Sequence, residues 1–244
     1  MIALSVKLGQ SVTHMSKHLV LLPGLDGTGR LFARFLAALP NTFSTATVAY
    51  PTDKSLSCIE LLQLVKSAVP ESASFVLVAE SFSAPLALQF ASSNPANLSA
   101  VIVCAGFVFK PIGIFSGLGR VAARPWLFKV RPPRWVLEYL LLGGGAPQAV
   151  IQELREALRL VNPKVLGDRV RAALTCDARN ALARISVPLL YLQPTQDMLL
   201  AKSCLCEMKR IKPSMVIEQL RGPHLLLQRE PQQAAKVICA FLSD

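Results

Sequence analysis

The feature that most constrains this 244-residue chain is a serine placed where a buried strand turns into a helix. Ser81 stands between the apolar run 74–79 and the helix-forming run 84–93. Such a corner is typical of a nucleophile elbow, in which a strained backbone lifts the serine Oγ above the sheet edge. The residues two before and two after the serine must be small, and here they are Ala79 and Ser83. A serine that only caps the helix also fits this pattern. The choice between a nucleophile and a cap therefore depends on whether the chain supplies catalytic partners.

The partners of Ser81 can be sought directly, because the chain has only three histidines and two lie within its first 18 residues. The third, His224, follows the run 215–220, which predicts the last strand. An acid is expected after the preceding strand, 187–193, and Asp197 ends the loop there. Taken singly, His224 could be a surface residue and Asp197 a helix cap. Their occurrence after Ser81, in the order Ser, Asp, His, predicts a catalytic triad.

A glycine-rich loop after the first buried strand supplies the fourth element of such a site. The run 19–22 leads into Pro23-Gly24-Leu25-Asp26-Gly27-Thr28-Gly29, and a helix is expected from about residue 30. We expect Gly24 to let the backbone turn, so that the Leu25 N–H faces a developing oxyanion. The second donor is the Phe82 N–H. A phosphate-binding loop is the competing interpretation, but the glycines do not fit G-x-G-x-x-G and no Lys-Ser/Thr follows.

Short apolar strands alternate with helical segments along most of the chain. This alternation predicts the α/β class, with a mostly parallel sheet covered on both faces. The expected strands are 18–22, 45–50, 74–79, 98–104, 187–193 and 215–220. The expected helices are 30–39, 56–68, 84–93, 199–210 and 231–242. The long stretch 107–184 breaks the alternation, so we expect a core of residues 1–106 and 185–244 with an insertion between them.

These motifs resemble those of the α/β-hydrolase superfamily, and most of all small bacterial carboxylesterases with a similar Pro-Gly-Leu-Asp-Gly-Thr-Gly loop and Glu-Ser-Phe-Ser elbow. The resemblance covers nearly all of the chain from residue 18 onward. It implies that Ser81 is the nucleophile, His224 the base and Asp197 the acid that orients the base. It also implies that 107–184 forms a helical cap over the nucleophile, and that neither a metal ion nor an organic cofactor is needed.

The chain departs from this family pattern at two places. Pro23 stands where many relatives have histidine, which matters little because the oxyanion donor is a backbone amide. Ala79 and Ala84 stand where glycine is common, so the elbow has less room beside it. Asp177, before the return to the sheet, is interpreted as a structural hydrogen-bonding acid and not as a second catalytic acid.

The chain is basic, with a formal net charge of +11, and most of the excess lies in the insertion. Residues 107–184 hold thirteen Lys/Arg against five Asp/Glu, a net +8. Three interpretations stay open: a solvated cationic face, attraction of anionic substrates or an acidic acyl-carrier protein, and transient contact with an anionic membrane. Nucleic acid is not expected as a partner, because no recognition motif accompanies the charge.

The cysteines and the hydropathy of the chain give expectations about its cellular compartment. The six cysteines show no zinc spacing and are expected to be free thiols in a reducing cytoplasm. No apolar run reaches the roughly 18–20 residues that a membrane helix needs. The first 17 residues lack a signal-peptide pattern, and Met15 is an alternative start.

The sequence therefore predicts a serine hydrolase that cleaves carboxylic esters of small to medium acyl chain through an acyl-enzyme. An acyl thioesterase or an acyltransferase would use the same triad. From a different class, a non-catalytic binding protein with the same fold is the remaining alternative. Selectivity depends on the shape of the insertion, so the natural substrate and the oligomeric state stay open at this point.

Overall fold

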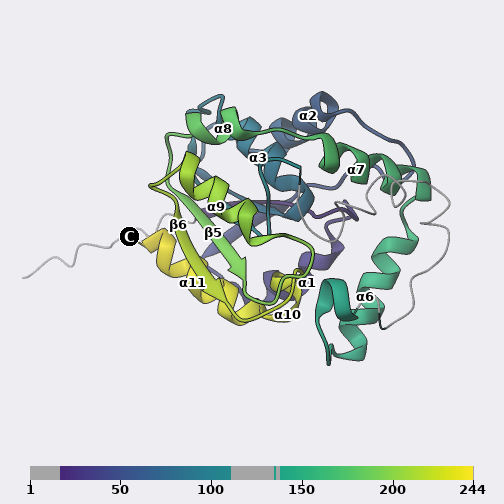
Figure 1. Cartoon of the computed structure of the whole chain (residues 1–244). Helices are drawn as coiled ribbons and strands as arrows, with labels where there is room; N and C mark the ends of the chain where they lie inside the picture. The colour runs from purple at the N-terminus through teal and green to yellow at the C-terminus, as the bar shows by residue number, and fades with distance from the viewer. Residues whose placement is uncertain (1–16, 111–134, 136–137, 244) are drawn as a thin grey trace, which may run out of the picture.

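A computed structural model describes residues 17–110, 135 and 138–243 (Figure 1). Within these residues, six strands form one sheet in the order β2-β1-β3-β4-β5-β6, and every neighbouring pair is parallel. The strands are β1 (Lys17–Leu22), β2 (Phe43–Thr47), β3 (Phe75–Glu80), β4 (Leu98–Cys104), β5 (Leu189–Pro194) and β6 (Val216–Leu220). The predicted α/β class and parallel sheet are confirmed.

One strand lies earlier in the sequence than predicted. The sequence places it at 45–50, whereas β2 ends at Thr47. The buried Val48 and Tyr50 suggest a continuing strand. The Val48 N–H still bonds to β1, at the Leu21 carbonyl, but the Tyr50 N–H donates to the Gly27 carbonyl in the glycine-rich loop. The chain after β2 therefore runs beneath the glycine-rich loop.

Helices connect the strands and begin at residues with clear local signals. For example, α2 starts after Ser57, whose side chain forms a capping box with Glu60. The described helices are η1 (Arg30–Phe32), α1 (Ala33–Ala38), α2 (Cys58–Ala68), η2 (Ser81–Ser83), α3 (Ala84–Ala91), η4 (Glu138–Leu142), α6 (Gln148–Arg159), α7 (Pro163–Thr175), α8 (Arg179–Arg184), α9 (Lys202–Ile211), α10 (Leu226–Arg229) and α11 (Pro231–Ser243).

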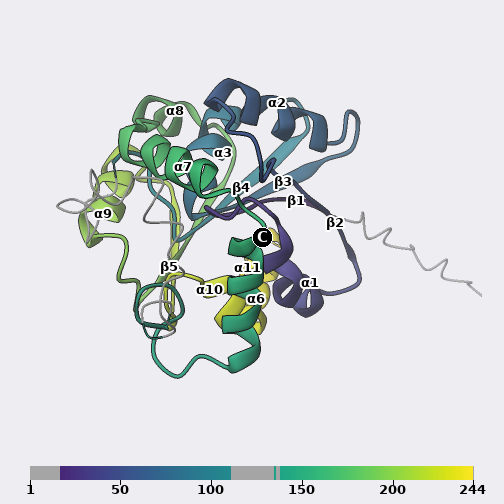
Figure 2. The ribbon, with the colours of Figure 1, turned by 90° about the vertical axis from the view of Figure 1, so that its right-hand side faces the viewer.

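The sheet is covered on both faces (Figure 2). Val20 and Leu22 of β1 point into a core shared with α2, α3, α8 and α9, whereas Leu19 and Leu21 point into a core shared with α1, α10 and α11. Successive residues of a strand face opposite sides of a sheet, so burial on both sides requires the continuous apolar runs of the sequence.

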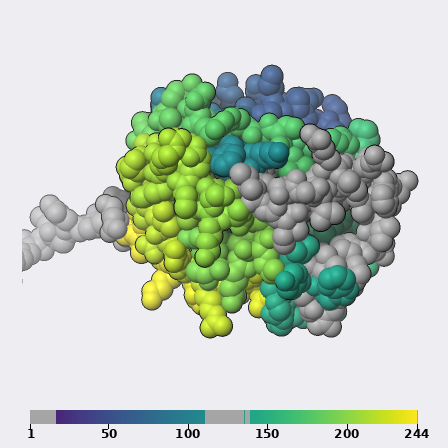
Figure 3. Space-filling view, in the orientation of Figure 1, coloured from purple at the N-terminus to yellow at the C-terminus, as the bar shows by residue number. Residues whose placement is uncertain are grey.

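The described part of 107–184, the segment predicted to be an insertion, packs against the rest of the chain in separate clusters. Helix α6 packs through Val150 and Leu154 in a cluster with Leu31 and Leu225, and the start of α7 packs against Leu25. By contrast, α8 lies in the core layer with α3 and α9. The chain just after β4 lies beside α8 on the face shown in Figure 3, because Phe109 forms a β-bridge with Asp177.

Several sequence predictions fall outside the described residues. They include the N-terminal leader with Met15, and five of the thirteen basic residues of the insertion: Arg120, Arg124, Lys129, Arg131 and Arg134. Within the described part of the chain, no helix is both long enough and apolar enough to cross a membrane.

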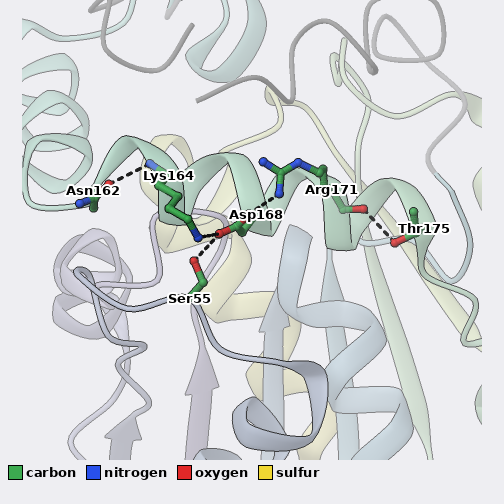
Figure 4. A network of polar contacts seen from close by, with 6 residues as sticks. All are labelled: Ser55, Asn162, Lys164, Asp168, Arg171 and Thr175. Atoms are coloured by element: carbon green, nitrogen blue, oxygen red, sulfur yellow. Dashed lines mark hydrogen bonds and ion pairs between the residues drawn. The ribbon is translucent and has the colours of Figure 1, made fainter. Parts of the chain in front are cut away.

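A polar network joins helix α7 to the loop before α2 (Figure 4). The Asp168 carboxylate accepts hydrogen bonds from Ser55, on the loop before α2, and from Lys164 and Arg171 of its own helix. Asn162 caps the start of the helix by accepting the Lys164 N–H at 2.9 Å. These contacts fix α7 above the loop that follows β2.

Candidate active site

Ser81 occupies a sharp corner between β3 and α3. Its φ of 49° is in the left-handed region, which is uncommon for a residue with a side chain. The corner is crowded, as the alanines at 79 and 84 predict. A Cβ on Gly106, just after β4, would lie 2.5 Å from the Ala84 Cβ, so only glycine fits there. Gly106 thus supplies the room that Ala84 takes away.

The structure brings together the three residues expected to form the triad. The Ser81 Oγ lies 2.8 Å from the His224 Nε2, and the His224 Nδ1 lies 2.8 Å from the Asp197 Oδ2. The side chains of His224 and Asp197 are 4% and 8% exposed, whereas Ser81 is half-buried. A hydroxyl, an imidazole and a carboxylate therefore form one hydrogen-bonded chain that ends at an accessible oxygen.

Asp197 has two tasks in this arrangement. Its Oδ2 bonds to His224, while its Oδ1 accepts the N–H groups of Leu199 and Leu200. Burial acts to raise the pKa of Asp197, but the nearby His224 and the two amides outweigh it and hold the pKa below its ordinary value. Asp197 does not cap α9, which begins at Lys202 after Ala201; its second oxygen instead holds the bend at Leu199 and Leu200.

Sheet topology explains why residues so distant in sequence meet. All the described strands are parallel, so the loops that follow them emerge at one edge of the sheet. The strand order reverses between β1 and β3: β2 lies on one side of β1, and β3 and the later strands lie on the other. Ligands of parallel sheets bind at such a switch point, and here the glycine-rich loop and Ser81 flank it.

The glycine-rich loop lies directly against the nucleophile. A Cβ on Gly24 would lie 4.0 Å from the Ser81 Cβ. Gly24 itself does not have a positive φ; Gly27 and Gly29 do, at 69° and 72°. Gly24 begins the turn, because its carbonyl accepts the Gly27 N–H at 3.1 Å, whereas the direction of the Leu25 N–H stays a prediction. Neither the Leu25 nor the Phe82 amide donates a loop or turn hydrogen bond within the described residues.

Ser83 does more than keep the elbow small. Its hydroxyl donates a hydrogen bond to the Pro23 carbonyl and accepts one from the Tyr50 hydroxyl at 2.6 Å. All three groups are buried, so this short chain joins the elbow to the glycine-rich loop. Burial raises the pKa of Tyr50 well above its ordinary value, so its hydroxyl stays a donor. The sequence offers no signal for this link beyond the presence of Ser83 itself.

Arg169 is the second residue that sequence reasoning missed. It lies on α7, yet its guanidinium donates to the carbonyls of Leu25 at 3.0 Å, Asp26 at 2.7 Å and Pro51 at 2.8 Å. The same group lies 5.7 Å from the centre of the Tyr50 ring. A buried arginine needs such partners. It therefore holds the glycine-rich loop in place from outside the sheet.

An apolar cavity adjoins the elbow. Its volume is about 270 Å³, and Phe82 lines it together with residues from α2, α3 and α7. The Phe82 ring is nearly buried and meets the Tyr50 ring edge-on at 6.3 Å. The side chain of the residue after Ser81 thus forms part of the wall of this cavity.

Asp177 lies away from the triad and bonds to Arg179. Its carboxylate accepts the backbone N–H and the guanidinium of that residue, and these bonds lower the pKa of Asp177 to about 2. The structure gives it the hydrogen-bonding role that the sequence suggests.

Similar structures carry the same fold over almost the whole chain. A lipase-esterase related protein from Clostridium acetobutylicum matches 93% of this chain and 94% of its own, with a TM-score of 0.77 and 14% identity. A bromoperoxidase from Bacillus anthracis matches 94% of this chain and 92% of its own, with a TM-score of 0.78 and 16% identity. An enol-lactonase from Burkholderia xenovorans also matches 94% of this chain and 92% of its own, with a TM-score of 0.76 and 16% identity. At these identities the likeness establishes the fold alone.

Sequence comparison establishes the family. No curated protein sequence gives a significant match. The model of the alpha/beta hydrolase family matches residues 19–237, a span that contains the elbow, the glycine-rich loop and all three residues of the Ser–His–Asp chain. The chain therefore belongs to the α/β hydrolase family.

Proposed function

We propose that the protein is a serine hydrolase that cleaves carboxylic esters through an acyl-enzyme on Ser81. One observation carries this proposal: the Ser81 Oγ, at a positive-φ corner, lies 2.8 Å from a histidine nitrogen whose ring is held by a buried aspartate. A structural serine needs none of these features. Family membership supports hydrolysis as the reaction class.

The reaction follows from the roles of the three side chains. Because the Nδ1–H of His224 donates to Asp197, its Nε2 carries a lone pair toward Ser81 and can take the hydroxyl proton. The Oγ then attacks the ester carbonyl, and the alcohol leaves with the proton from His224. Water, activated by the same imidazole, releases the acyl group from Ser81.

The oxyanion that forms during attack needs donors that are already in place. We assign this role to the Leu25 and Phe82 amides, because one follows Gly24, which adjoins Ser81, and the other follows Ser81 itself. The links from Ser83 to Pro23 and from Arg169 to Leu25 support the assignment, since they fix both peptide segments before substrate arrives.

The substrate side is proposed more broadly. Leu25 and Phe82 give the site apolar walls, which suit a small to medium acyl ester. In this proposal, residues 107–184 act as a cap that sets selectivity, since α7 contacts Leu25 and lines the cavity beside Phe82. A panel of p-nitrophenyl esters of rising chain length, assayed beside an acyl-CoA, separates an esterase from a thioesterase.

Replacement of Ser81 tests the function directly. Ser81→Ala should fold normally and lose ester hydrolysis by a factor on the order of 10³ or more, because no other group can form the acyl-enzyme. A fluorophosphonate should label the wild-type protein at Ser81 alone, as read by peptide mass spectrometry. The matched control is Ser93→Ala, which removes an exposed serine and should leave labelling intact. Activity that survives in Ser81→Ala, or labelling at another residue, would overturn the proposal.

A further inference from the structure

Two buried polar side chains beside the site have no part in the mechanism above. Glu80 ends β3, immediately before Ser81, and is 1% exposed. Gln228 lies on α10, four residues after His224, and is 3% exposed. The Gln228 Nε2 donates to the Glu80 Oε2 at 3.3 Å. One side chain thus directly precedes the nucleophile, the other lies one helical turn after the base, and the two meet in the interior.

The contact between them is half complete. The Glu80 Oε1 and the Gln228 Oε1 are both buried, and neither has a hydrogen-bond partner among the described residues. A buried oxygen without a donor is costly, and natural structures rarely keep two in one contact. Both oxygens are acceptors when the carboxyl group is ionised. A single proton on the Glu80 Oε1 would give each oxygen a partner, because this oxygen becomes a donor and the Gln228 Oε1 can accept from it.

The charges around Glu80 favour that proton. Burial raises its pKa to about 7, and the nearby Asp26 carboxylate acts in the same direction. His224 and the hydrogen bond from Gln228 oppose this shift but are weaker. The Cys104 thiol, opposite Glu80 on β4, stays neutral because burial raises its own pKa well above the ordinary value.

We propose that Glu80 is held as a protonated carboxylic acid that donates its O–H to the Gln228 amide oxygen. The two side chains then form a cyclic acid–amide pair, with one hydrogen bond in each direction. The inference that this pair serves catalysis rests on the proposed function. Glu80 is a positioning residue in this scheme, because it touches no reacting atom and acts through the segments that carry Ser81 and His224.

Loss of the proton would harm the site in two ways. Ionised Glu80 faces the Gln228 oxygen with like partial charge, so the link between the elbow and α10 weakens. It also places a negative charge beside the glycine-rich loop, since the Glu80 Oε2 would lie 3.6 Å from a Cβ on Gly24. That loop leads to the Leu25 amide, where negative charge develops during attack. We therefore expect activity to fall as Glu80 ionises.

The first test compares pH profiles of ester hydrolysis. In the wild-type protein, kcat should fall by roughly tenfold or more between about pH 7 and about pH 9, in addition to the usual loss at low pH when the base is protonated. Glu80→Gln keeps both hydrogen bonds as an amide–amide pair and cannot ionise, so its kcat should stay level over that range. Gln228→Leu breaks the pair but leaves Glu80 free to titrate, so it should lower kcat at every pH and keep the alkaline loss. An alkaline loss that persists in Glu80→Gln would overturn the positioning role.

The second test needs no activity. Infrared difference spectra of the Ser81→Ala protein should show the carbonyl band of a protonated carboxylic acid near neutral pH. This band should fade as the pH rises and should be missing from the Ser81→Ala, Glu80→Gln double variant. A missing band in Ser81→Ala would overturn the protonated pair even if the esterase assignment holds. A band without ester hydrolysis in the wild-type protein would refute the proposed function and leave the pair intact.

Discussion

The loop after β5 and the end of β3 each bring a buried carboxyl group near His224, but they surround it differently. Asp197 accepts three hydrogen bonds, from His224 and from two backbone amides, and its pKa lies below the ordinary value. Glu80 accepts one, and its pKa rises to about 7. Both side chains are removed from water. Burial raises the pKa of both groups, but His224 and two amides outweigh it at Asp197, whereas the Asp26 carboxylate adds to it at Glu80.

The largest effect is expected when the negative charge of Asp197 is removed. Asp197→Asn should lower kcat by about 10³- to 10⁴-fold with a smaller effect on KM, because an amide cannot hold His224 in the required tautomer. Steady-state kinetics on a p-nitrophenyl ester measures this effect. The control is Glu218→Gln, which changes an exposed carboxyl group on β6 and should be near normal. If Glu218→Gln were inactive and Asp197→Asn active, the orienting acid would have been misassigned.

An effect of intermediate size is expected from Glu80 on stability. The folded pKa of Glu80 lies above its ordinary value of 4.5, so the folded state binds this proton more tightly than the unfolded state. Stability from this group is therefore full below about pH 4.5 and is lost as pH rises through about 7. Glu80→Gln does not titrate. Its stability relative to wild type should thus improve by about 3 kcal/mol between about pH 4.5 and about pH 8.

Chemical denaturation at several pH values measures this change in the free energy of unfolding. Comparing the variant with wild type at each pH cancels the titration of the other carboxyl groups. A difference that stays constant with pH would show that Glu80 ionises in the folded protein as it does in the unfolded chain.

The smallest effect is expected at a third carboxyl group, which has many donors but little burial. The hydrogen bond from Ser55 and those from Lys164 and Arg171 lower the pKa of Asp168 to about 2. Its partners Lys164 and Arg171 are largely exposed, so water screens the ion pairs. Asp168→Asn should cost less than about 1 kcal/mol, and high salt should reduce the cost further. A loss of several kcal/mol, insensitive to salt, would mean that this network stabilises α7 as a buried pair would.

The sequence predicts the triad because each member directly follows a strand. Ser81 follows β3, Asp197 follows β5 and His224 follows β6, and the ends of parallel strands share one edge of a sheet. An apolar run and the residue after it are local signals that one sequence contains. The same reasoning finds the glycine-rich loop and the turn that begins at Gly24, although it does not single out the positive φ of Gly27 and Gly29.

The contacts that support the site could not be predicted in this way, because they join residues far apart in the sequence. Glu80 meets Gln228 across 148 residues, and Arg169 reaches Asp26 across 143. No local pattern announces either contact, because each partner alone resembles an ordinary polar residue on a helix or at a strand end. Such contacts depend on how whole helices pack. The spacing of apolar residues predicts which face of a helix is buried, but it does not fix the position of the helix along its neighbours. The strand boundary at residues 48–50 fails for the same reason, since the Tyr50 N–H bonds to Gly27, in a loop that lies 23 residues earlier.

The position of Arg169 has a consequence for anyone who exchanges parts between members of this family. The side chain belongs to the inserted segment, yet three of its hydrogen bonds go to carbonyl oxygens of the core. A chimera that takes its insertion from another hydrolase would lose these bonds unless the donor sequence supplies an arginine at the same place on its helix. Such a chimera could bind the new substrate and still turn it over slowly. If this segment sets selectivity, as proposed above, then selectivity and rate cannot be exchanged independently, because the same segment holds the glycine-rich loop through Arg169.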